Sequence, residues 1–209
     1  AELNETDAQL KLLYDALVET GGVDDTLFVV VGVHGEPLGE DPALGYNNQL
    51  SDAELRVPML VSFPARLPAG VRPQQTVEHV DLVPTILELC GLTPSEGSQG
   101  RSLVTVLEGR GDDLAAPAFS AKSNTHRAVA QGRYHYLLRS GDNDLLFDRS
   151  QAGNGARDDR RAQLPLAHRA LRDALAMHLS SVSWRDEAQF GSVRSPRADW
   201  ATSALQRGW

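Results

Sequence analysis

The residues best suited to chemistry follow an apolar run near the start of the chain. Residues 26–31 are aliphatic or aromatic apart from one threonine, and His34, Glu36, Glu40 and Asp41 come soon after them. Imidazole and carboxylate groups are ligands for divalent cations, and hard cations prefer several oxygen atoms. Two interpretations stay open: His34 contacts a metal or a substrate, or hydrogen bonds of its loop hold it without a chemical role.

Helices and strands on both sides of this segment must position it. Apolar spacing predicts an amphipathic helix that ends at Gly21. Residues 26–31 and 58–63 are predicted to be short buried strands. A strand that is apolar on both faces is typical of the middle of a covered, mainly parallel sheet. Asp81 is predicted to cap a helix over residues 82–90, and Gly91 is predicted to end it.

The pattern changes to antiparallel β after residue 112. Short strands are predicted over residues 127–131, 134–139 and 145–148, and a helix with one apolar face over 171–182. The predicted fold class is α/β: part of a mixed, mainly parallel sheet flanked by helices, followed by a small antiparallel β and helix subdomain. The predicted parts are the α/β core over residues 1–112, the subdomain over 113–182, and a polar, tryptophan-containing tail over 183–209.

Composition excludes some classes of function. The 209 residues carry a formal net charge of -8, which disfavours binding to nucleic acid and to anionic membrane surfaces. No apolar run approaches the roughly 18 residues of a membrane span. The single cysteine, Cys90, excludes an internal disulfide and a thiolate metal cluster, and it is predicted to be a small buried hydrophobic residue.

Five short motifs occur in order along the chain. They are His34-Gly35-Glu36, Arg56-Val57-Pro58, Asp81-Leu82-Val83-Pro84-Thr85, Gly100-Arg101-Ser102-Leu103, and Arg133-Tyr134 with Leu146-Phe147-Asp148. In this order and spacing the chain resembles the sulfatase family of the alkaline-phosphatase superfamily, over roughly residues 6–180. The resemblance implies hydrolysis of sulfate or phosphate esters by a formylglycine nucleophile, with a divalent cation, usually calcium, that offsets the charge of the transferred group.

The chain departs from the family pattern at the implied metal site. The family has an Asp-His or Asp-Asn pair after the strand, and here Val33 stands at the aspartate position beside His34. The family's nucleophile motif belongs to an earlier region that this chain does not contain, and Cys90 lacks the family's Pro-x-Arg context. We therefore assign His34 as the metal residue, assign no catalytic residue, and expect the chain alone to be inactive.

Two buried strands are fewer than a sheet typically needs. The missing strands are expected from an N-terminal half of the fold, on the same or another chain, and the resemblance implies an anionic ester or sugar as substrate. The compartment stays open, with the periplasm or secretion as the options that many bacterial sulfatases suggest. One alternative function is a non-catalytic pseudo-sulfatase for binding or assembly. Another is a hydrolase whose cation site is rebuilt from His34, Glu36, Glu40 and Asp41.

Overall fold

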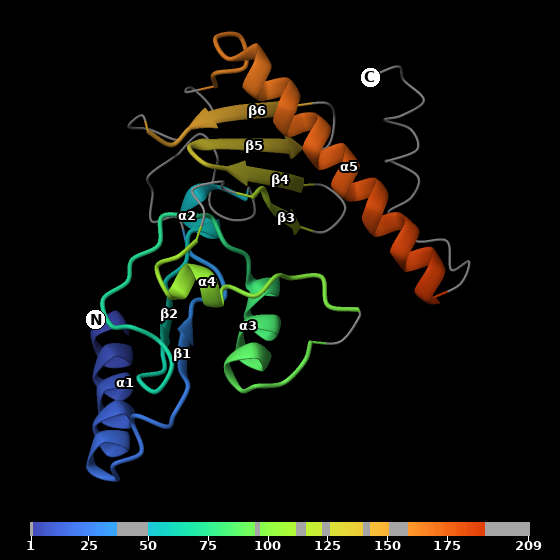
Figure 1. Cartoon of the computed structure of the whole chain (residues 1–209). Coiled ribbons are helices and arrows are strands. Elements are labelled where there is room, and N and C mark those ends of the chain that lie inside the picture. The colour runs from blue at the N-terminus through green and yellow to red at the C-terminus, as the bar shows by residue number, and fades with distance from the viewer. Residues whose placement is uncertain are drawn as a thin grey trace. The chain divides into compact units, whose positions relative to one another are not determined.

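The computed structural model describes residues 2–36, 50–94, 97–111, 116–122, 126–139, 143–150 and 159–190. The chain divides into two compact units, one from Ala1–Val33 and Val57–Leu114 and the other from His34–Arg56 and Ala115–Trp209. The first holds α1 (Glu2–Glu19), β1 (Phe28–Val31), β2 (Met59–Ser62), the 3-10 turn η1 (His79–Asp81), α3 (Leu82–Leu89) and α4 (Val104–Leu107) (Figure 1). The second holds α2 (Asp52–Leu55), β3 (Ala118–Lys122), β4 (His126–Gln131), β5 (Tyr134–Arg139), β6 (Asn143–Asp148) and α5 (Pro165–Phe190). These two discontinuous units do not test the predicted boundaries, so the parts 1–112, 113–182 and 183–209 stay a prediction.

The first unit contains a two-stranded antiparallel sheet. β1 and β2 pair from Phe28 opposite Ser62 to Val31 opposite Met59. The mainly parallel sheet predicted from the apolar run is therefore not seen, because no two strands of the described residues pair in parallel. An apolar run indicates that both faces of a strand are to be covered, but it carries no information about the direction of the neighbouring strand.

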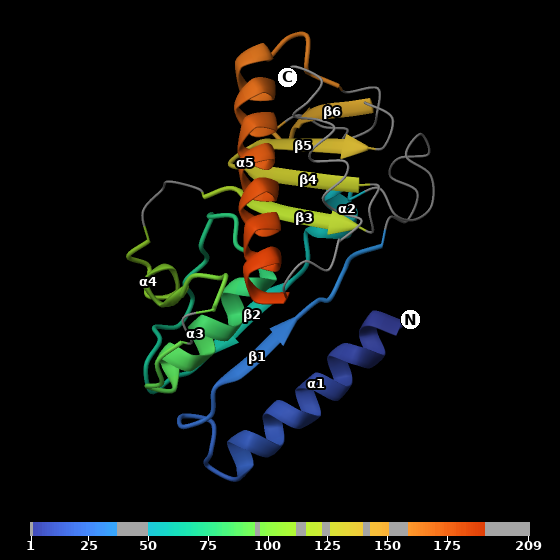
Figure 2. The same cartoon turned by 90° about the vertical axis from the view of Figure 1, so that its right-hand side faces the viewer.

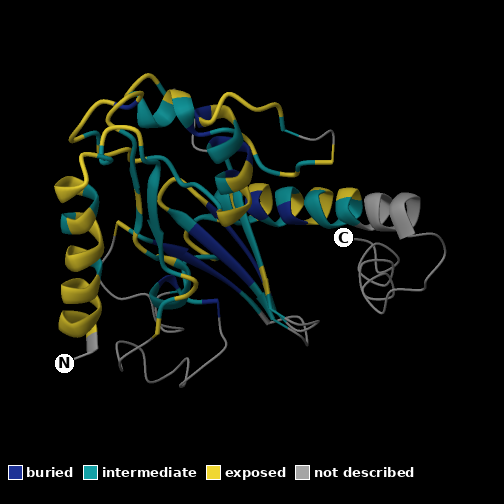
Figure 3. Cartoon of the chain, turned by 90° about the horizontal axis from the view of Figure 1, so that it is seen from below, coloured by how far each residue is buried: buried dark blue, intermediate teal, exposed yellow. Residues whose placement is uncertain are grey.

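Apolar side chains of the first unit remain exposed. Leu60 of β2 is 53% exposed and Val18 of α1 is 51% exposed, and the helix that begins at the N-terminus is largely in the exposed colour in Figure 3. The rings of Tyr14 and Phe28 meet edge to face with centroids 5.8 Å apart, which packs α1 against β1. The predicted helix is confirmed, but its apolar stripe is only partly covered, and both strands are half-buried rather than buried.

Asp81 holds together two motifs of the first unit. Its carboxylate accepts hydrogen bonds from the backbone N–H of Glu78 and of Arg101, both at 2.9 Å. The Thr85 hydroxyl donates to the Asp81 carbonyl at 2.5 Å and accepts from the Leu103 N–H at 2.9 Å. Asp81 occupies the N-cap position of α3, as predicted, but its carboxylate makes no cap bond to that helix and instead ties the 100–103 segment to η1.

The end of α3 follows the prediction in part. Gly91 adopts the left-handed backbone conformation, with φ of 73°, directly after the helix, as its predicted role as a helix stop requires. Cys90 is exposed, so its prediction as a buried residue is wrong. It is the C-cap residue of α3, and the apolar face of that helix ends at the buried Leu89 before it.

The second unit is built on a four-stranded antiparallel sheet in the order β3-β4-β5-β6. Its register runs from Ala118 opposite Ala130 to Tyr134 opposite Asp148. The predicted strands β4, β5 and β6 are confirmed, whereas β3 and the first turns of α5 were not predicted. None of the helices in the described part of the chain has both the length and the apolar character needed to cross a bilayer.

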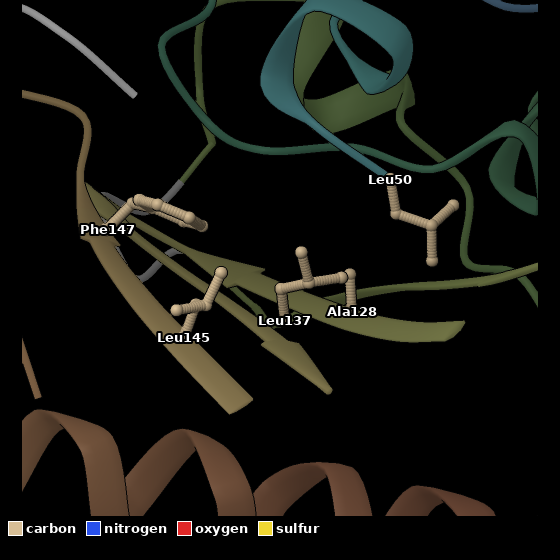
Figure 4. Packing of buried hydrophobic residues seen from close by; sticks show 5 residues of the cluster. All are labelled: Leu50, Ala128, Leu137, Leu145 and Phe147. Carbon is tan, nitrogen blue, oxygen red and sulfur yellow. The ribbon is translucent and has the colours of Figure 1, made fainter. Parts of the chain in front are cut away.

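Each face of this sheet is covered by a different segment. α5 crosses one face, where Leu171 and Leu175 pack in a cluster with Val129, Tyr136 and Leu146 (Figure 2). On the opposite face Leu50, just before α2, belongs to a cluster whose other members come from the strands: Ala128, Leu137, Leu145 and Phe147 (Figure 4). The sheet therefore has two apolar faces, and α2 is the cover of one of them.

Gly100→Ala should destabilise the protein, because a Cβ at this position would lie 2.0 Å from the Val80 carbonyl oxygen. The cost is expected to reach about 3 kcal/mol or more, since backbone rather than a flexible side chain must move. Gly97→Ala is the matched control, because a Cβ there meets nothing within 4 Å. Urea unfolding of both variants measures the difference, and equal midpoints would contradict the close approach of Gly100 to η1.

Candidate functional site

His34 lies on an exposed segment at the start of the second unit. Its Nδ1 is 3.0 Å from the carbonyl oxygen of Gly35, and Glu36 beside it is also exposed. Val33 is 81% exposed and offers no ligand atom. Glu40 and Asp41, the other members of the predicted cation site, fall outside the described residues. Among the described residues no three His, Cys, Asp or Glu side chains gather as a metal site, and the metal role of His34 stays a prediction.

The backbone of Gly35 is laid directly against α2. Its N–H donates to the Glu54 carbonyl at 2.8 Å. A Cβ on residue 35 would lie 1.9 Å from the carbonyl oxygen of Ala53, so only glycine fits at this approach. The glycine of the His34-Gly35-Glu36 motif is therefore required by packing. Its contact with α2 determines the position of the backbone next to His34.

α2 is a single turn whose ends are held by side chains. The Glu54 carboxylate accepts the Ser51 N–H at 3.0 Å and lies 3.3 Å from the Ser51 hydroxyl, which closes the first turn. Leu50 before it has φ of 54°, a left-handed conformation that is unfavourable for any residue but glycine. Burial of the Leu50 side chain against the sheet, where it is 7% exposed, offsets that cost.

A buried ion-pair cluster anchors α2 to the sheet. Arg149, just after β6, donates to Asp52 Oδ1 from Nε at 2.9 Å, and one of its terminal nitrogens lies 2.7 Å from the same oxygen. His135 Nδ1 lies 3.2 Å from the same oxygen. Asp52 is 8% exposed and His135 is 2% exposed. Burial on its own raises the pKa of Asp52, but the hydrogen bonds and charges of His135 and Arg149 outweigh it and lower that pKa below its ordinary value.

A second polar cluster lies on the opposite face and joins β5, β6 and α5. The Tyr136 hydroxyl donates to Asp144 at 3.2 Å, and His168 and Arg161 contact the same carboxylate. Burial, and then the charge of Asp144, raise the pKa of Tyr136 well above its usual range. Burial opposes ionisation of Asp144, yet hydrogen bonds from His168 and Arg161 lower its pKa. Each of these four side chains is paired within the cluster, so its role is to fasten α5 to the sheet.

Sequence patterns missed both clusters. Asp52 and Arg149 are 97 residues apart, so no local spacing connects them. The alternation of Tyr134, Tyr136 and Leu138 did place His135 on the other face of β5, and that was the available signal. Arg56 of the second motif is exposed.

Two family models match the chain. The model described as Sulfatase matches residues 1–92, and the model described as N-sulphoglucosamine sulphohydrolase, C-terminal, matches residues 47–149. Together they span residues 1–149, which include the five motifs and the four strands β3 to β6 of the second unit. The chain belongs to the sulfatase family of the alkaline phosphatase superfamily and covers a portion of that fold.

Individual relatives carry the same result. The chain is 28% identical to a choline-sulfatase of Rhizobium meliloti over 220 residues, covering 100% of this chain and 41% of the relative. It is 30% identical to an ulvan-active sulfatase of Formosa agariphila over 138 residues, covering 65% of this chain and 22% of the relative. The solved phosphonate monoester hydrolase of Agrobacterium radiobacter aligns with a TM-score of 0.67 and 25% identity, over 87% of this chain and 40% of that one. The chain therefore spans about two fifths or less of these relatives.

Asp52→Asn should lower the free energy of unfolding at pH 7 by roughly 3 kcal/mol, because it leaves Arg149 buried without its carboxylate. The folded-state pKa of Asp52 lies below its unfolded value of about 3.9, so its contribution is present above that pH and is lost as the pH falls through the folded-state pKa. The difference between wild type and variant should therefore shrink below about pH 4.

Urea unfolding between pH 7 and pH 3 measures this difference. Asp15→Asn is the control, because Asp15 pairs with Lys11 on the exposed surface of α1, where such pairs contribute about 0–1 kcal/mol. A wild-type advantage over Asp52→Asn that stays constant down to pH 3 would contradict the lowered pKa.

Proposed function

We propose that this chain is the C-terminal part of a sulfatase-family ester hydrolase and that it is inactive by itself. The observation that carries this proposal is the match to only 40% of a related hydrolase structure, combined with the open apolar surface of the first unit. In this proposal β1 belongs to a larger, mainly parallel sheet, whose other strands and whose nucleophile come from the N-terminal half of the fold. The substrate class is an anionic ester, with sulfate, phosphate and phosphonate monoesters as the candidates.

The described residues do not make a calcium site. Calcium takes six to eight oxygen ligands, whereas the segment after β1 offers an imidazole from His34, one exposed carboxylate from Glu36, and a valine at position 33. We therefore derive no catalytic step through a cation from this chain. His34 is its single proposed contribution to a shared metal site, and the oxygen ligands of that site have to come from elsewhere.

Val33 also supports a second candidate function. If the whole protein lacks the oxygen donor that its family has at this position, it is a pseudo-sulfatase that keeps the fold to bind an anionic sugar or to assemble with a protein. The two candidates differ in the region that precedes this chain in the family. A Cys-x-Pro-x-Arg or Ser-x-Pro-x-Arg stretch encoded there supports the hydrolase, and its absence supports the binding module.

Turnover assays test the proposal directly. The chain alone is expected to show no hydrolysis of 4-nitrophenyl sulfate, phosphate or phenylphosphonate with added calcium. In the protein that carries the complete fold, His34→Ala should lower kcat/KM by at least roughly 10-fold, the scale seen when the surroundings of a metal are disturbed. His79→Ala is the matched control, because His79 is also exposed but belongs to η1. Clear activity of the chain alone that His34→Ala abolishes would overturn the proposal.

Calorimetric titration separates the rebuilt cation site from both candidates. Calcium, magnesium and manganese are each titrated into the chain and into a Glu36→Gln, Glu40→Gln, Asp41→Asn variant. The proposal predicts that none of these cations binds to the chain alone, because Val33 stands where the family has an aspartate that supplies an oxygen ligand. Stoichiometric binding that the triple variant removes would establish the rebuilt site instead.

A further inference from the structure

We propose that Asp52, held by Arg149 and His135, positions the His34 segment for function. The small β subdomain then determines, through α2, where this segment lies. This inference rests on the proposed function of His34. It assigns Asp52 and Arg149 as positioning residues, which act through the backbone of α2 and contact no substrate.

The first step is that His34 does not determine its own position. The side chain is exposed, and its ring nitrogen Nδ1 lies 3.0 Å from the carbonyl oxygen of the next residue, Gly35. A contact within one residue cannot orient a loop relative to the rest of a fold. The position of the imidazole is therefore set by the backbone of residues 34–36.

The second step is that this backbone is set by α2. The Gly35 N–H donates to the Glu54 carbonyl at 2.8 Å, and the missing Cβ of Gly35 lets the chain approach the Ala53 carbonyl oxygen. A shift of α2 by even a fraction of an ångström would therefore be transmitted to residue 35. His34 moves with it because it is the adjacent residue.

The third step is that α2 depends on the sheet. Four residues make one helical turn, which is not stable in water without external contacts. The apolar contacts of Leu50 and Leu55 with the sheet are not directional. The contact of Arg149 with Asp52 is directional, because Nε and a terminal nitrogen of one planar guanidinium both lie against the same carboxylate oxygen. Together with His135 it sets where along the sheet α2 lies.

Burial prevents water from replacing the contact between Arg149 and Asp52. Asp52 is 8% exposed, and the side chain of Arg149 is 15% exposed, so water cannot easily replace either group. Loss of Arg149 leaves the buried Asp52 carboxylate with the His135 imidazole but without a guanidinium, so we expect α2 to move toward water. The displacement is expected in α2 and Gly35 first, because β4 and β5 are held by their own ladder of backbone bonds.

Amide hydrogen exchange by NMR on the chain tests the inference with three variants. In Arg149→Met the Gly35 amide is expected to exchange at least about 10-fold faster, while Val129 and Leu137 in the sheet core change by less than about 3-fold. Arg149→Lys keeps the charge but loses the planar donor pair. The exchange rate of the Gly35 amide in this variant should therefore lie between the rates in wild type and in Arg149→Met. Arg169→Met is the control, because Arg169 forms an exposed ion pair with Asp173 on α5.

Two results would overturn the inference. One is a wild-type exchange rate for Gly35 in Arg149→Met, and the other is an equal acceleration at Gly35, Val129 and Leu137, which indicates global destabilisation. If Arg149→Met does not fold, Arg149→Lys decides, and an unchanged Gly35 rate in that variant overturns the inference.

Activity of the complete protein supplies the functional half of the test. Arg149→Met is expected to lower kcat/KM by about 10–100-fold, with partial recovery in Arg149→Lys, under conditions where both are fully folded. Full activity in a folded Arg149→Met variant with fast Gly35 exchange would overturn the functional part. Full activity in His34→Ala would instead remove the proposed function, while a local rise in Gly35 exchange would still uphold the mechanical connection.

Discussion

A one-turn helix cannot hold itself in place, and the second unit is arranged around the contacts that hold α2. The carboxylate of Asp52 is buried at the start of that turn and is matched by the guanidinium of Arg149 and the imidazole of His135. Burial of a charge is costly unless it is paired with good geometry, and here one oxygen lies within 3.2 Å of three nitrogens. The same turn buries Leu50 in the core of the sheet and provides the surface on which Gly35 rests.

The first unit shows the opposite balance, with strong local ties and an open surface. Asp81, Thr85 and Gly100 connect two family motifs through backbone hydrogen bonds and one close approach, which explains these residue types without any catalytic role. Yet β1 and β2 stay half-buried and α1 exposes much of its apolar stripe. An apolar surface of this kind is normally covered. The size of the related hydrolases, of which this chain spans about two fifths, fits a cover provided by the rest of the fold.

In our proposal, family membership and chemistry separate in this protein. The motifs that belong to packing, such as Gly35 and the Asp81–Gly100 connection, are present and have clear structural reasons. The proposed loss of chemistry concerns the first motif, where Val33 stands at the position of the family's oxygen donor beside His34. This contrast supports two candidate functions, a hydrolase and a pseudo-sulfatase.

The sequence by itself determined the family, α1, the helix stop at Gly91 and the strands β4 to β6, because these depend on motif order and on apolar periodicity within a few residues. Only the tertiary structure decided that β1 runs antiparallel to β2, that Cys90 is exposed, and that the Asp81 carboxylate accepts from the Arg101 N–H instead of making a cap bond to α3. It also decided that Asp52 meets Arg149 across 97 residues. Strand direction and ion pairs depend on which distant segments come together, and local side-chain patterns do not encode that choice.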